Sequence, residues 1–158
     1  MHRKFQWINS DEVHSQGIVY YELMSNNTTV TADVYCEQLD RVREAVQQKR
    51  PNQQIIKILH DNARPHVARK SKEKLNELGW EVLIHPPYSP DLSPSDYHLF
   101  NSISNFFRGK SFSDRSQIEL AITKFFDSKP AEFLKSGIDK LFDRWKKVIN
   151  SDGEYILN

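Results

Sequence analysis

Residues 55–66 read IIKILHDNARPH, a short run of apolar side chains that passes directly into a cluster of polar ones. The run is nearly continuous and only a few residues long, which predicts a strand buried on both faces over residues 55–60. In open α/β sheets, ligands bind beyond the carboxyl ends of the strands, so Asp61 occupies a position suited to function. Taken alone, Asp61 could also be a turn residue whose carboxylate accepts a backbone hydrogen bond.

Strand and helix patterns alternate on both sides of this run. Residues 18–24 (IVYYELM) are β-branched and aromatic and predict a strand, while the run WEVLIH predicts another over residues 80–85. Apolar side chains at helical spacing and turn residues predict helices over residues 31–49, 65–79, 95–107, 113–128 and 138–150, with a short helical turn from Pro130. Phe5, Trp7 and Ile8 could add a strand. This order predicts an α/β domain with a mixed sheet flanked by helices.

A second polar position follows a stiff loop. Residues 86–94 (PPYSPDLSP) hold four prolines, each of which fixes its own backbone and biases the preceding residue away from helix, so we expect an extended loop. Within it, Asp91 is interpreted as a turn residue, with a contribution to a metal site as the alternative. Ser93, Pro94 and Asp96 then match a capping-box-like helix start, which places Asp96 in the first helical turn.

One helix and one strand separate Asp61 from Asp96, enough to return the chain to a neighbouring position. Two carboxylates at strand and helix ends can bind divalent ions that activate a nucleophile and stabilise a leaving oxygen in phosphoryl transfer. The alternative is that Asp96 only caps its helix. The histidine spacings match no standard zinc finger and Cys36 is the single cysteine, so structural zinc is disfavoured.

Charge is uneven along the chain although the formal net charge is only +1. Residues 1–40 carry 2 basic and 6 acidic side chains (−4), residues 41–74 carry 10 and 3 (+7), and residues 75–158 carry 10 and 12 (−2). The middle segment is therefore either a phosphate-binding surface or a solvated helix face. Its candidate phosphate contacts are Arg41, Arg43, Lys49, Arg50, Arg64, Arg69, Lys70 and Lys72.

Composition limits the protein class further. A length of 158 residues fits one domain, and 12 Gly plus Pro exclude a collagen-like or wholly disordered chain. No stretch approaches the roughly 20 apolar residues that span a bilayer, and the first residues lack the apolar core of a secretory signal. A single cysteine fits a reducing compartment, cytosol or nucleus.

Residues 60–66 (HDNARPH) and 80–100 (WEVLIHPPYSPDLSPSDYHLF) together closely resemble the mariner family of DNA transposases, in the C-terminal part of the catalytic domain. The resemblance extends to residues 20–23, Leu39, Arg144-Trp145 and residues 152–155, so it covers about residues 17–156. It implies a ribonuclease-H-like fold in which three aspartates bind two Mg²⁺ or Mn²⁺ ions, and the second and third aspartates have the spacing of Asp61 and Asp96.

From the resemblance we expect Asp61 and Asp96 to be catalytic metal ligands that share an ion, with His60 and Asn62 nearby. It also implies a nuclear protein of a transposable element, whose partners are transposon ends and target DNA during transposition and DNA integration. A homodimer is compatible with it, whereas a membrane or a small-molecule substrate is not expected.

The chain also departs from the family pattern. Its first 16 residues do not resemble the strand that bears the family's first catalytic aspartate, and Asp11 and Glu12 are the only carboxylates there. We therefore expect a divergent segment (1–16) before a partial catalytic domain (17–158) that lacks the family's first strands and its helix-turn-helix region, with one metal ion bound weakly. Two hypotheses stay open: a transposase catalytic domain with impaired cleavage and strand transfer, or a domesticated or degenerate non-catalytic remnant that binds DNA or a protein partner.

Overall fold

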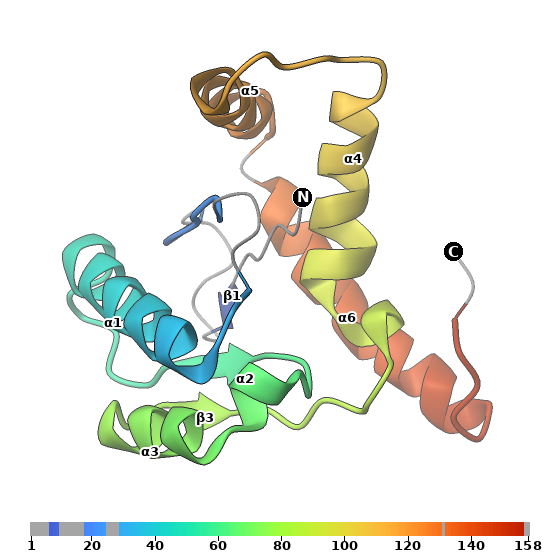
Figure 1. The fold of residues 1–158 in the computed structure, drawn as a ribbon. Coiled ribbons are helices and arrows are strands. Elements are labelled where there is room, and N and C mark those ends of the chain that lie inside the picture. The colour runs from blue at the N-terminus through green and yellow to red at the C-terminus, as the bar shows by residue number, and fades with distance from the viewer. Residues whose placement is uncertain (1–6, 10–17, 25–28, 131, 157–158) are drawn as a thin grey trace. The chain divides into compact units, whose positions relative to one another are not determined.

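A computed structural model describes residues 18–24, 29–130 and 132–156, and the backbone alone of residues 7–9 (Figure 1). The described residues form two compact units. The first unit contains those up to Tyr88, and the second contains those from Ser89 onward. Within the described ranges, no helix combines the length and the apolar composition needed to cross a bilayer.

The first unit is built on a small mixed sheet in the order β1-β2-β3. Strand β1 (Trp7–Asn9) runs antiparallel to β2 (Lys57–Leu59), and β2 runs parallel to β3 (Glu81–Val82). Ile8 and Val82 both lie opposite Ile58 in the register. The mixed sheet is as expected and Trp7 and Ile8 do form a strand, whereas the central and third strands are shorter than residues 55–60 and 80–85.

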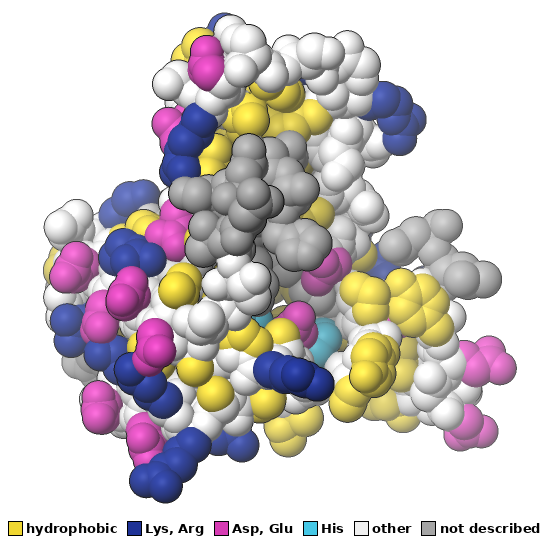
Figure 2. Space-filling model, viewed as in Figure 1, with side chains coloured by type: hydrophobic (Ala, Val, Ile, Leu, Met, Phe, Trp, Pro, Cys, Tyr) yellow, Lys and Arg dark blue, Asp and Glu magenta, His cyan; other side chains and the backbone are white. Residues whose placement is uncertain are grey.

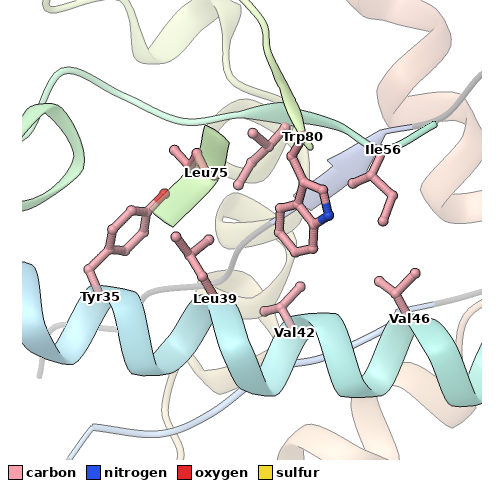
Figure 3. Close-up of a cluster of buried hydrophobic side chains, with 8 residues drawn as sticks. Tyr35, Leu39, Val42, Val46, Ile56, Leu75 and Trp80 are labelled. Atoms are coloured by element: carbon pink, nitrogen blue, oxygen red, sulfur yellow. The ribbon is translucent and has the colours of Figure 1, made fainter. Parts of the chain in front are cut away.

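Helix α1 (Ala32–Lys49) packs on one face of this sheet and forms the core of the first unit (Figure 3). The helix begins after Thr31, whose hydroxyl accepts a hydrogen bond from the Val34 N–H at 3.3 Å. Its apolar side chains recur at helical spacing and point toward the sheet and the following helix, so they are removed from water together. The buried cluster comprises Tyr35, Leu39, Val42, Val46, Ile56, Ile58, Leu75 and Trp80. Ile55 is 66% exposed, so the central strand is not buried on both faces along its whole predicted length.

The strand predicted over residues 18–24 does not form; the segment has no regular secondary structure. Side chains of α1 occupy its polar groups instead. Lys49 Nζ donates to the carbonyls of Ile18 and Val19, at 3.1 and 2.7 Å, and Arg41 and Gln38 both donate to the Glu22 carboxylate. Local composition favoured a strand, but strand pairing needs a neighbouring backbone, and this segment is held by a helix.

The helix predicted over residues 65–79 is divided into α2 (Arg64–Val67) and α3 (Arg69–Glu77). The break is at Ala68, whose backbone is extended (φ −58°, ψ 145°). Gly79 follows the end of α3 with φ +67°, the left-handed conformation expected of a glycine that terminates a helix.

The second unit begins with the proline loop. This loop is not extended throughout, because residues Pro90–Leu92 form a 3₁₀ turn, η2. A π-helical segment, η3 (Ser95–Phe100), leads into α4 (Asn101–Phe107), so the helix predicted over residues 95–107 has two geometries. Helices α5 (Arg115–Asp127) and α6 (Glu132–Asn150) complete the unit, and α6 begins six residues earlier than predicted.

Candidate metal site and basic surface

Asp61 follows β2 in the turn before α2. Its Oδ1 accepts a hydrogen bond from the Ala63 N–H at 3.0 Å, which confirms the turn interpretation. The side chain is nevertheless 62% exposed, so the carboxylate remains open to solvent at the carboxyl end of the strand. The backbone bond fixes the direction of the carboxylate without burying it.

Two histidines, His66 and His60, belong to the surroundings of Asp61. Buried His66 places Nδ1 2.6 Å from Asp61 Oδ1, and because a carboxylate oxygen accepts, Nδ1 carries the proton. The His60 ring centroid lies 5.1 Å from that of His66, and His60 Nδ1 shares a 3.0 Å hydrogen bond with the Tyr35 hydroxyl. Burial, followed by the nearby His66, lowers the pKa of His60 to about 4, so this ring is neutral at physiological pH. Asp61 is therefore bonded to a donating His66, whose ring packs against an uncharged His60.

Asn62 connects the two polar motifs of the sequence. Its Nδ2 donates to the carbonyl of His85 at 2.8 Å. His85 directly precedes the proline loop, so this bond ties the end of the central strand to the point where the loop begins. Asn62 therefore has a structural role beside Asp61.

Asp96 lies half-buried in the first turn of η3. The Ser93 carbonyl accepts from the N–H groups of Asp96 and Tyr97, at 2.9 and 3.1 Å. The Ser93 hydroxyl bonds to the Ser95 hydroxyl at 2.7 Å, so both the main chain and the side chain of Ser93 take part in this helix start.

Asp91 has a larger role than the turn residue that the sequence suggested. Its side chain is only 2% exposed, its Oδ2 accepts from the Ile156 N–H at 3.0 Å, and its carbonyl accepts from Arg144 Nη1 at 3.1 Å. Oδ1 of Asp91 is buried, and no hydrogen-bond partner for it occurs among the described residues. The only hint in the sequence was that the loop and Arg144 both belong to the stretch that resembles the mariner family.

Half of the predicted phosphate contacts are engaged in ion pairs. Asp and Glu side chains pair with four of the eight, which are Arg41, Arg43, Arg69 and Lys70. Lys74, a neighbouring residue outside this set, pairs with Asp40. On the face shown in Figure 2, basic and acidic side chains are correspondingly interspersed over the α1 and α3 region. The acidic first segment of the sequence thus neutralises part of the basic middle segment.

The other four candidates differ from one another. Arg50 is only 7% exposed, so it is removed from the candidate surface contacts, because a buried guanidinium does not reach an external phosphate. Lys49 donates to backbone carbonyls. Arg64 and Lys72 are exposed, and within the described part of the chain they have no hydrogen-bond or ion-pair partner.

The donor set fits a hard divalent ion only in part. Carboxylate oxygens are the ligands that Mg²⁺ and Mn²⁺ prefer, and Asp61 offers one such group to solvent. Over the described ranges, however, no group of three or more His, Cys, Asp or Glu side chains is placed to hold a metal. Asp61 and Asp96 belong to different units, so their sharing of an ion stays a prediction. Asp11 and Glu12 lie outside the described residues.

Comparison with known proteins agrees with the motifs. A family model described as transposase (partial DDE domain) matches residues 14–56. The mariner Mos1 transposase of Drosophila mauritiana is 42% identical over 144 residues, which is 89% of this chain and 42% of Mos1. The histone-lysine N-methyltransferase SETMAR of Homo sapiens is 40% identical over 142 residues, which is 88% of this chain and 21% of SETMAR. The chain therefore spans less than half the length of either relative.

The fold matches a solved structure over almost all of its length. The Mos1 transposase catalytic domain, solved with raltegravir and Mn, superposes with a TM-score of 0.87 at 41% identity, covering 90% of this chain and 74% of that one. Other Mos1 structures that match include the catalytic domain with raltegravir and Mg and a paired-end complex with the left transposon end.

Proposed function

Because the chain belongs to the mariner family of DNA transposases, we propose that it forms part of a catalytic domain in which Asp61 and Asp96 bind divalent metal. The ribonuclease-H-like fold expected from the sequence is confirmed by the match to the Mos1 catalytic domain. The observation that carries the proposal is the open carboxylate of Asp61 at the carboxyl end of β2, held in one direction by Ala63 and His66. The Mg and Mn in the Mos1 catalytic-domain structures support the choice of ion.

Each residue of the site has a separate task in this proposal. Asp61 and Asp96 would hold the metal, which when bound activates water and stabilises a leaving oxygen in phosphodiester chemistry. His66 orients the Asp61 carboxylate through its 2.6 Å hydrogen bond. Hydrogen-bonded neighbours of this kind commonly fix the direction of metal-binding carboxylates.

We further propose that metal-dependent DNA cleavage and strand transfer, on transposon ends and target DNA in the nucleus, belong to the protein that contains this domain. For the 158-residue chain alone we expect weak metal binding and cleavage near background. The described residues supply two carboxylates rather than three, and a two-metal site normally clamps both the attacking and the leaving oxygen. Asp11 and Glu12 are the first candidates for a third ligand.

A second candidate function is DNA binding without cleavage, in keeping with a domesticated or degenerate remnant. It is favoured by Arg64 and Lys72, which are exposed and have no hydrogen-bond or ion-pair partner among the described residues. They lie on α2 and α3, beside ion pairs that are themselves exposed. Exposed ion pairs contribute only about 0–1 kcal/mol, so a phosphate can compete for their cations. Such contacts are made to the DNA backbone and confer no base specificity.

The two functions are separated by measuring Mn²⁺ binding calorimetrically and nicking of supercoiled DNA in parallel. We expect Asp61→Asn and Asp96→Asn each to weaken Mn²⁺ binding, because each removes a charged oxygen ligand. Asp127→Asn, which removes an exposed carboxylate near the end of α5, should leave binding unchanged.

The outcomes are distinct. Mn²⁺ binding that is the same in the wild type and in both site variants contradicts the metal site and leaves the DNA-binding function. Strong Mg²⁺-dependent nicking that Asp61→Asn abolishes confirms the site and contradicts the expected weak cleavage. In that case, Asp11→Asn and Glu12→Gln identify the third ligand.

A further inference from the structure

The C-terminal part of the second unit carries motif residues that the metal site does not use. Arg144-Trp145 and residues 152–155 belong to the stretch that resembles the mariner family, yet none of them is a proposed ligand. They lie in α6 and directly after it, and the residues around Asp96 make a series of contacts with this part of the chain. These contacts suggest that this C-terminal part of the chain positions the residues around Asp96.

We propose that α6 and the segment after it (residues 132–156) form a brace that fixes the position of Asp96, with Arg144 as its main positioning residue. The inference rests on the proposed metal-binding function and adds the residues that would hold Asp96 in the position where it binds the ion. Arg144 itself is no ligand in this proposal and acts through the residues that it contacts, Asp91 and Tyr97.

The brace holds the chain before Asp96 through Asp91. The Asp91 carbonyl accepts from Arg144 Nη1 at 3.1 Å, and its carboxylate accepts from the Ile156 N–H at 3.0 Å. Asp91 is 2% exposed, so both bonds are shielded from water and from competition by it. The turn η2, five residues before Asp96, is thereby fastened to α6 and to the segment that follows it.

The brace also holds the residue directly after Asp96. The Arg144 guanidinium carbon lies 4.1 Å from the centroid of the Tyr97 ring, within the range of a cation–π interaction. The Tyr97 hydroxyl donates to the Gly137 carbonyl at 2.6 Å. A single side chain, Arg144, therefore contacts the chain on both sides of Asp96.

The next residue, His98, completes the set. Its Nε2 lies 2.7 Å from the Phe133 carbonyl, which can only accept, and its ring packs 4.4 Å from the Phe133 ring. Anchors at positions 91, 97 and 98 leave Asp96 little freedom to move relative to α6. The π-helical geometry of η3 agrees with this, since such turns are frequent at functional sites.

The test is calorimetric Mn²⁺ binding to the whole chain, at a temperature where circular dichroism shows every variant folded. We expect Arg144→Gln to weaken Mn²⁺ binding about tenfold, the low end of the effect of residues that orient metal ligands. Arg144→Lys keeps the positive charge but lacks the planar guanidinium group. It should therefore bind Mn²⁺ more tightly than Arg144→Gln and less tightly than the wild type. The matched control is Lys146→Gln, which removes another cation–π pair of the same helix, whose partner Phe142 belongs to α6 rather than to η3.

A second variant keeps the test decisive if Arg144→Gln does not fold. Tyr97→Phe removes only the hydroxyl bonded to Gly137 and should weaken Mn²⁺ binding by a smaller factor, with the ring still under Arg144. Wild-type affinity in a folded Arg144→Gln or Tyr97→Phe variant overturns the brace, while the proposed function stands. Binding that Asp96→Asn leaves unchanged in the wild-type background overturns the proposed function and the brace together.

Discussion

Gly137 of α6 lies directly against the imidazole ring of His98, so closely that a Cβ atom at residue 137 would stand 2.5 Å from His98 Cδ2. Real Cβ atoms essentially never approach a neighbour to that distance. The ring has little room to withdraw, because its Nε2 is bonded to the Phe133 carbonyl and its face packs on Phe133. The close approach of η3 and α6 therefore depends on glycine at this position.

The first prediction concerns Gly137→Ala. Helix propensity alone would make alanine about 1 kcal/mol better than glycine in α6. We expect instead a net loss of about 1–2 kcal/mol in the free energy of unfolding, because overpacking a filled site outweighs the gain. Urea unfolding measures the change. Lys140→Ala, exposed on the same helix, should remain within about 0.5 kcal/mol of wild type, and greater stability of Gly137→Ala would show that the contact is loose.

The second prediction concerns the acid stability of the first unit. Burial acts to raise the pKa of Glu22, but hydrogen bonds from Tyr20, Gln38 and Arg41 outweigh it and hold the pKa below its usual value of 4.5. The folded state therefore binds the proton of Glu22 less readily than the unfolded state does. The stabilisation is complete above about pH 4.5 and is lost as the pH falls through the lowered folded pKa.

Glu22→Gln tests this. The wild type should be more stable than the variant at pH 6, and the difference between their unfolding midpoints should shrink as the pH falls from 4.5 toward 3. A difference that does not change with pH would show that the Glu22 charge contributes nothing.

The third prediction concerns DNA. Binding should be weak, independent of sequence and strongly dependent on salt, since the exposed cations Arg64 and Lys72 would contact phosphate, which carries no base information. Lys72→Gln should lower the slope of log K against log [salt] by about 0.9, the value for one phosphate contact. Lys124→Gln, in α5, is the exposed control and should leave the slope unchanged. Tight binding to one short duplex that competitor DNA does not displace would refute this.

A helix or strand could be predicted from the sequence where the residues that determine it lie within the element or beside it. Helix α1 was predicted to within one residue because its apolar spacing, Thr31 at its start and Pro51 after its end all lie within the helix or beside it. The strand predicted over residues 18–24 was wrong for the opposite reason. Its composition suits a strand, but its polar groups are bonded to Lys49, Arg41 and Gln38 of α1 rather than to a neighbouring strand.

The same difference between local signals and distant partners decides which parts of the candidate site could be predicted. Asp61 and Asp96 stand out because each lies at the end of a recognisable local pattern. The burial of Asp91 could not be predicted, because its partners Arg144 and Ile156 come 53 and 65 residues later in the sequence. Likewise, the excess of basic residues in the middle segment gave no sign that Asp33 and Asp40 would pair with Lys70 and Lys74.

The long separation between Asp91 and Ile156 also sets an order in time during synthesis of the protein. At about 5–20 residues per second, the ribosome needs roughly 3–13 s to add the 65 residues that separate Asp91 from its backbone donor. The strands and α1 of the first unit come earlier and can associate well within that interval, since helices form in about a microsecond and hydrophobic collapse takes up to about 100 μs. The surroundings of Asp96 are therefore completed only after the sheet and α1 of the first unit have had time to form.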